Sequence, residues 1–89
     1  MLWSDIRTLY PDKWLIIEAL DAYTNKKNQR KLKDIAIIDI CSNNKTVMKS
    51  YKELHKQYPQ REFYYVNTNK DELDIREKSW IGIRRGYEN

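Results

Sequence analysis

The side chains with the greatest potential for chemistry are one cysteine and one histidine. Cys41 and His55 could form a thiolate and imidazole pair, which is the arrangement that activates a cysteine nucleophile. Cys41 ends an expected strand and His55 lies at the edge of the apolar face of an expected helix, and nothing in their spacing brings them together. A structural zinc ion is usually held by four Cys and His ligands, which is more than this chain provides. We therefore predict no metal site and a structural or surface role for both residues.

Carboxylates offer a second chemistry, because a facing pair can act as general acid and base. Glu18 and Asp21 fall in one expected strand, and Asp34 and Asp39 fall in the next. Side chains alternate between the faces of a strand, and each pair combines an even and an odd position, so we expect each pair to be split. The chain has two glycines, too few for a phosphate-binding glycine-rich loop. We expect no cofactor and predict that the protein is not an enzyme.

Positive charge is a third feature with a chemical meaning. The net charge of +4 comes from 17 basic and 13 acidic residues, a more mixed surface than that of dedicated nucleic-acid binders. The segment TNKKNQRKLK, residues 24–33, nevertheless has five basic residues and no acid. We expect a protruding hairpin tip there, which is either a solvated loop or a contact for an anionic partner. The candidate anion or nucleic-acid contacts are Lys26, Lys27, Arg30, Lys31, Lys33, Arg84 and Arg85.

Three segments predict the strands of a sheet. Residues 14–23, WLIIEALDAY, and residues 31–41, KLKDIAIIDIC, are apolar on both alternations and predict an antiparallel pair covered on both faces, with a helix as the alternative for the first. Residues 62–68, EFYYVNT, predict a short aromatic strand. The simplest strand order places the first strand in the middle.

Two helices are expected around these strands. Residues 45–58 predict the main helix, with Asn44 as its N-cap and Pro59 as its stop. Its apolar stripe consists of Val47, Met48, Tyr51, Leu54 and Tyr58. A lysine row lies about half a turn away, which is typical of a solvated helix face, and consists of Lys45, Lys49, Lys52 and Lys56. A short helix capped by Ser4 is expected to run to about Tyr10.

The elements together predict an α+β fold in a single domain spanning residues 1–89. It has a small, mainly antiparallel sheet of three to four strands, one main helix packed on one face and a short N-terminal helix. One helix cannot cover both apolar faces, so the segment of Trp3, the segment of Trp80 or a second copy must cover the other. The candidate interface residues are Trp14, Ile17, Trp80, Ile81 and Ile83.

The sequence also bears on the compartment. A single cysteine cannot form an intrachain disulfide, which fits a reducing environment. There is no run of about 18 apolar residues, and the N-terminus lacks the basic and apolar regions of a signal peptide. We expect a cytoplasmic protein with no membrane partner.

Three stretches carry a family resemblance: RTLYPDKWLIIEAL, a helix ending in LHKQYP, and REFYYVNT followed by LDIREKSWIGIRR. Over nearly its whole length the chain resembles a family of small uncharacterised prokaryotic proteins with a strand, strand, helix, strand order. Such proteins are often encoded beside retropepsin-like aspartic proteases, which implies an accessory or regulatory partner role. The resemblance implies no catalytic residue, and the Asp-Thr/Ser-Gly triplet of that protease is absent.

The sequence therefore favours a non-enzymatic module that binds another protein or a second copy of itself, as a homo-oligomer, through the sheet face and the Trp80 segment. The alternative is a small nucleic-acid-binding or antitoxin-like regulator that uses the basic hairpin. A homodimer and a protein partner are both compatible with exposed strand edges and excess apolar sheet surface.

Overall fold

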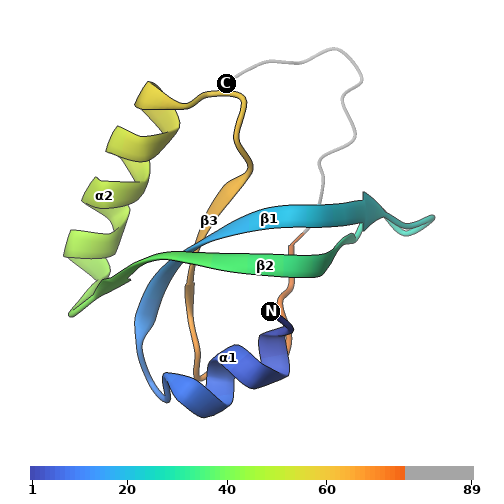
Figure 1. Ribbon diagram of the computed structural model, residues 1–89, viewed down its shortest axis with the longest axis horizontal. Coiled ribbons are helices and arrows are strands. Elements are labelled where there is room, and N and C mark those ends of the chain that lie inside the picture. Colours follow the sequence, from blue (N-terminus) through green and yellow to red (C-terminus); the bar gives the residue numbers. More distant parts are fainter. Residues whose placement is uncertain (76–89) are drawn as a thin grey trace.

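The computed structural model describes residues 1–75, which form a three-stranded antiparallel sheet with a helix on each face (Figure 1). The elements are α1 (Trp3–Leu9), β1 (Trp14–Thr24), β2 (Arg30–Cys41), α2 (Asn44–Gln57) and β3 (Phe63–Asn67). The strand order is β2-β1-β3, and β1 is antiparallel to both neighbours. The α+β fold and the central position of the first strand are thus confirmed.

The hairpin of β1 and β2 is much longer than β3 and projects beyond it as an arm (Figure 1). Its register shifts at three places, between Ile16 and Ile17 and on either side of Asp21. Such bulges bend a strand and increase its twist. At the tip, Asn28 adopts a φ of 61° and takes the left-handed conformation that glycine usually supplies. The side-chain oxygen of Asn25 accepts hydrogen bonds from two backbone N–H groups of this turn.

Helix α2 has the expected apolar stripe but begins one residue before the predicted position. Asn43, not Asn44, is the N-cap, because its side-chain oxygen accepts a 2.8 Å hydrogen bond from the N–H of Thr46. The helix ends at Gln57, two residues before Pro59. Neither helix of residues 1–75 is long and apolar enough to cross a membrane.

Helix α1 starts earlier than predicted, and its predicted cap is wrong. Leu2 occupies the N-cap position without a side-chain hydrogen bond. Ser4 lies inside the first turn, where its backbone carbonyl accepts a hydrogen bond from the hydroxyl of Thr8. The helix is held by tertiary contacts in place of a cap.

The two faces of the sheet carry separate apolar clusters. The α2 face buries Ile16, Cys41, Val47 and Phe63. The α1 face buries Ile6, Leu15, Ile17 and Ile35, with Trp3 and Leu73 packed against them. The segment of Trp3 therefore covers the second face, which is one of the three alternatives predicted from the sequence.

Thr68, directly after β3, joins α1 and β1 to the end of β3. It is 2% exposed, and its backbone N–H donates to the carbonyl of Lys13. Its hydroxyl donates to the carbonyl of Tyr10 and accepts from the N–H of Lys13. Its carbonyl accepts from Nε of Arg7 at 3.0 Å. Every polar group of this buried threonine is therefore paired, as the desolvation of polar groups requires.

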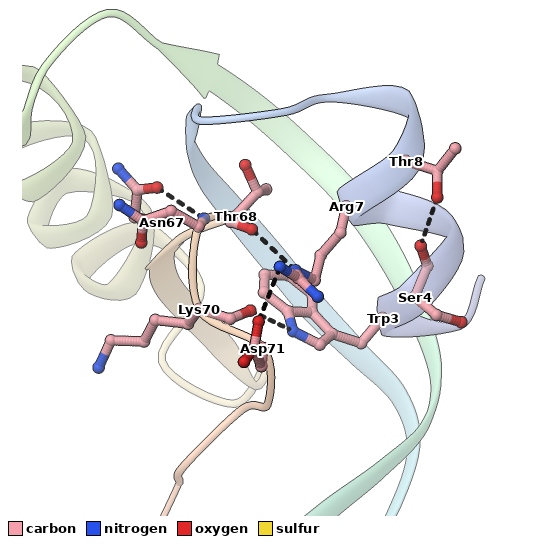
Figure 2. Close-up of polar contacts among 9 residues, drawn as sticks. Trp3, Ser4, Arg7, Thr8, Asn67, Thr68, Lys70 and Asp71 are labelled. Atoms are coloured by element: carbon pink, nitrogen blue, oxygen red, sulfur yellow. Dashed lines mark hydrogen bonds and ion pairs between the residues drawn. The ribbon is translucent and has the colours of Figure 1, made fainter.

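The segment that follows Thr68 extends this contact along α1, as Figure 2 shows. The indole N–H of Trp3 donates to the carbonyl of Lys70, and the guanidinium of Arg7 donates to Asp71, at 3.1 and 3.0 Å. Both side chains point from α1 toward the loop (Figure 2). These contacts fix the loop beside the C-terminal end of β3.

Candidate functional site

The outer edge of β3 is open within the described part of the chain. The N–H of Ala19 donates to the carbonyl of Glu62, which identifies the residues whose backbone groups face β1. Because these groups alternate in an antiparallel ladder, Phe63, Tyr65 and Asn67 direct theirs outward. No residue among 1–75 hydrogen-bonds to the backbone of Phe63 or Tyr65 on that side. This edge can therefore accept a further strand.

A cleft of about 300 Å³ lies beside the open edge. Trp14 and Tyr51 line it and also pack with the α2-face cluster, whereas Leu73 lines it and packs with the α1-face cluster. The cleft therefore lies where the two layers meet at the edge of the sheet. Its other lining residues are Tyr64, Tyr65, Val66, Asn67, Lys70, Asp74 and Ile75. We call this feature the β3-edge cleft.

The aromatic wall of the β3-edge cleft is a contiguous set of rings. Tyr51 meets Tyr65 edge-on with ring centroids 5.1 Å apart and stacks on His55 at 5.9 Å. Tyr65 remains 39% exposed, so its ring offers surface to a ligand. Burial raises the pKa of the Tyr51 hydroxyl. The wall is suited to large apolar or aromatic side chains.

An ion pair fixes the first end of β3 against the hairpin. Arg30 of β2 binds both carboxylate oxygens of Glu62 at 2.8 and 2.9 Å and also donates to the hydroxyl of Thr24. The hydroxyl of Tyr64 donates to the same carboxylate. Hydrogen bonding to Arg30 lowers the pKa of Glu62, and burial raises the pKa of Tyr64. Arg30, predicted as a candidate anion contact, is therefore engaged with Glu62 inside the chain.

A second ion pair stands beside the first. Arg61 binds both carboxylate oxygens of Glu18 on β1, at 2.9 and 2.6 Å, and this hydrogen bonding lowers the pKa of Glu18. The guanidinium also lies 4.8 Å from the ring centroid of Phe63 and 5.0 Å from that of Tyr58. Bidentate pairs of this kind fix geometry as well as add energy. Both pairs lie at the first end of β3, and the hydrogen bonds of Thr68 hold the other end.

The predicted interface residues fall in different places. Trp14 is partly buried and lines the β3-edge cleft. Ile17 is completely buried beneath α1, so its prediction as an interface residue is corrected: it is a core residue. Trp80, Ile81 and Ile83 lie outside the described residues.

The predicted basic hairpin is only partly available. Lys26 and Lys27 are exposed at the tip, Lys33 is exposed on β2, and Lys31 is half-buried. Within residues 1–75 none of these four lysines takes part in an ion pair. Arg84 and Arg85 lie outside the described residues.

The candidate nucleophile is in an unfavourable setting. The Cys41 thiol is buried, and burial together with the Asp39 carboxylate 3.8 Å away raises its pKa, which disfavours the reactive thiolate. His55 is exposed on α2 against Tyr51. In the part of the chain that the structure describes, no three His, Cys, Asp or Glu side chains group closely enough to hold a metal ion.

The carboxylates of the strands have structural partners. Register shifts place Asp21 directly opposite Asp34, a pairing that simple alternation did not predict. Asp34 accepts a 2.6 Å hydrogen bond from the N-terminal ammonium of Met1, which lowers its pKa. Asp39 accepts a hydrogen bond from the N–H of Ile40.

The opposite edge of the sheet differs from that of β3. A wider groove of about 790 Å³ lies between β2 and α2, with Ile38 and Leu54 among its lining. The β2 edge beside it is partly occupied, because Met1 and Ile35 exchange backbone hydrogen bonds of 2.8 and 3.1 Å. Near the C-terminal end of β2, the Asp39 side chain accepts a hydrogen bond from the N–H of Ile40.

The sequence prediction missed the β3-edge cleft, although one signal pointed to it. The stretch EFYYVNT, residues 62–68, has aromatic residues on both alternations, which is unusual for a strand at a sheet edge. Once β1 is central, this stretch must be an edge strand. Comparison with protein families, with curated proteins and with solved structures finds no match for the chain.

Proposed function

We propose that this protein is a non-enzymatic interaction module of the cytoplasm that binds an extended segment of another protein chain at the open edge of β3. The observation that carries the proposal is the combination of outward backbone groups on Phe63 and Tyr65 with the aromatic cleft beside them. Neither feature alone would suffice, since open edges and small clefts are both common.

The physical basis is strand addition. A segment paired with β3 would gain main-chain hydrogen bonds to Phe63 and Tyr65, while a side chain enters the cleft and contributes specificity. The cleft volume of about 300 Å³ lies at the small end of ligand pockets, which fits one large side chain better than a cofactor. The ion pairs of Arg30 and Arg61 hold the strand in place, which reduces the entropy that binding must spend.

A second copy of the chain is an alternative ligand for the same edge, because antiparallel pairing of two β3 strands is compatible with a two-fold axis. The resemblance to proteins encoded beside retropepsin-like proteases agrees with an accessory role, in which the module would bind a protein partner. The residues Trp80, Ile81 and Ile83, proposed from sequence as interface residues, follow the cleft-lining Ile75 in the chain.

The test separates the strand edge from the ring. Tyr65→Ala removes the ring but keeps the outward N–H, whereas Tyr65→Pro removes both and leaves the ladder to β1 intact. Tyr23→Ala is the matched control, since Tyr23 is 51% exposed on the hairpin arm. Peptides selected from a random display library on the wild-type chain are measured by fluorescence anisotropy against each variant, after circular dichroism has confirmed folding.

We expect binding to weaken with Tyr65→Ala, to weaken further with Tyr65→Pro and to be unchanged with Tyr23→Ala. Failure to select any peptide, or equal binding to folded Tyr65→Pro and wild type, would refute the proposal. Sedimentation of the same proteins shows whether a second copy is the ligand, since a dimer through β3 is lost with Tyr65→Pro.

The hairpin favours a second candidate function, a nucleic-acid-binding regulator. Its observation is the pair of exposed lysines Lys26 and Lys27, which have no ion pair within residues 1–75. Single- and double-stranded oligonucleotides of 20 units would be titrated at about 20 and 150 mM salt, because phosphate contacts are strongest at low salt. Absence of binding at low salt, or binding unaffected by K26E/K27E, would refute this candidate.

A further inference from the structure

Helix α2 borders the β3-edge cleft and brings residues close to it that do not line the cleft themselves. Tyr51 lines the cleft from α2, and His55 stacks on its ring. Met48, which is 36% exposed, lies three residues before Tyr51 and therefore on the same side of the helix. Met48 and His55 thus form the shoulder of α2 above the aromatic wall.

Lysines stand directly behind this shoulder. Lys52 lies four residues after Met48 and three before His55, and Lys45 lies three residues before Met48, so both neighbour the shoulder on the helix surface. Both are exposed, and neither is in an ion pair within residues 1–75. Lys49 and Lys56 continue the row away from the cleft.

The acidic residues do not balance these lysines. Lys70 adds a cation to the cleft lining, where the acid is Asp74, which is already engaged in an interaction within the chain. On α2 the acid is Glu53, and it lines the groove toward β2 instead. The other carboxylates near the cleft face elsewhere: Glu18, Glu62 and Asp71 are each paired with an arginine, and Glu72 lines a separate pocket beside Lys31. The rim of the cleft is therefore basic.

We infer that the ligand of the β3-edge cleft is an acidic extended segment of a partner protein, with Asp or Glu residues flanking the large side chain that enters the cleft. This inference rests on the proposed function and adds the chemistry of the partner. Charge complementarity selects this ligand, because Lys70 lines the cleft while Lys45 and Lys52 neighbour Met48 and His55 on the surface of α2. A nucleic acid lacks the backbone N–H and C=O groups that would pair with Phe63 and Tyr65.

The experiment uses the full chain and a random eight-residue peptide display library. Enriched peptides are sequenced, synthesised with a fluorophore and titrated against wild type, K45E/K52E and the control K26E/K27E. The control makes the same change of net charge on the hairpin tip, where Lys26 and Lys27 are exposed. Tyr65→Pro is included to report on the strand edge itself.

We expect acidic peptides to dominate the selection. K45E/K52E should reduce their affinity about tenfold or more, and the control far less, because K45E/K52E turns two exposed attractive charge pairs with the peptide into repulsive ones. Raising NaCl from about 0.05 to 0.5 M should weaken the same peptides. Neutral or basic peptides that bind equally to K45E/K52E overturn this inference while the proposed function stands.

Other results are equally decisive. An equal loss of peptide affinity in K45E/K52E and K26E/K27E would show that only the net charge of the protein matters, and it would overturn the inference. Peptides that bind Tyr65→Pro as tightly as wild type refute the proposed function itself. A dimer abolished by Tyr65→Pro, or displacement of the peptide by a 20-unit oligonucleotide, assigns the cleft to a second copy or to nucleic acid and overturns the acidic partner segment.

Discussion

Thr68 is the residue at which a small change should cost most stability. Thr68→Val keeps nearly the same shape but removes a hydroxyl that donates to the Tyr10 carbonyl and accepts from the Lys13 N–H. The substitution leaves these two backbone groups without a partner in a site where Thr68 is 2% exposed. A buried polar group left unpaired costs about 1 to 3 kcal/mol. The hydrogen bonds of the Tyr10 and Lys13 backbone groups are only part-buried, which places the cost of each group near the lower end.

The expected loss is about 2 to 3 kcal/mol, which corresponds to a fall in Tm of about 10 to 20 °C for a domain of this size. Thr68→Ser keeps the hydroxyl and loses only a buried methyl group, so it should cost about 1 kcal/mol. Thr8→Val is the matched control, because the Thr8 hydroxyl bonds to the Ser4 carbonyl on an exposed face of α1. Figure 2 shows both threonines.

Urea unfolding followed by circular dichroism, supported by thermal melts, measures all three variants. A free energy of unfolding for Thr68→Val within about 0.5 kcal/mol of that for Thr8→Val, a difference typical of neutral surface changes, would refute the role of the Thr68 hydroxyl. It is also refuted if Thr68→Ser is as unstable as Thr68→Val, since shape and not the hydroxyl would then be responsible.

Three further predictions concern other parts of the fold. The Arg30 pair lowers the folded-state pKa of Glu62, so the stabilisation that it provides is present above the usual Glu pKa of about 4.3 and is lost as the pH falls below that value. Glu62→Gln should therefore lower the stability at pH 7 and make the loss of stability toward pH 3 less steep. Equal acid sensitivity of the variant and the wild type in urea titrations would contradict this. Cys41 should react with a thiol reagent only after unfolding, and rapid stoichiometric labelling of the native chain would show that the thiol is accessible. Asn43→Ala should cost about 1 kcal/mol as the loss of an N-cap, with Asn44→Ala as a nearly neutral control, and the reverse order in urea unfolding would place the cap at Asn44.

The elements of the fold were predictable from sequence because their signals are local. The apolar stripe of α2 repeats at helical spacing, and the long runs of apolar residues in β1 and β2 are typical of strands covered on both faces. The errors at the helix starts, Asn44 for Asn43 and Ser4 for Leu2, are of one or two residues. Adjacent asparagines are equally good caps, so the sequence does not discriminate between them.

Features that depend on distant pairing were not predictable. Arg30 was predicted as a candidate anion contact because its partner, Glu62, lies 32 residues away in the sequence. Ile17 was assigned to an interface because a strand with two apolar faces does not reveal which face α1 covers. The opposition of Asp21 and Asp34 depends on bulges, which follow from how two strands fit together and not from either alone.

The two edges of the sheet are unequal, and this difference is the strongest reason to place binding at β3. Natural sheets protect their edges with bulges, inward charges or short covering segments. The β2 edge has bulges in its pairing with β1, an outward N–H at Ile40 that donates to the Asp39 carboxylate, and Met1 paired with Ile35 as a short covering segment. Within residues 1–75 the edge at Phe63 and Tyr65 has none of them, and it carries exposed aromatic surface where protection would favour charge. Within residues 1–75 this difference between the two edges supports the proposal of strand addition at β3.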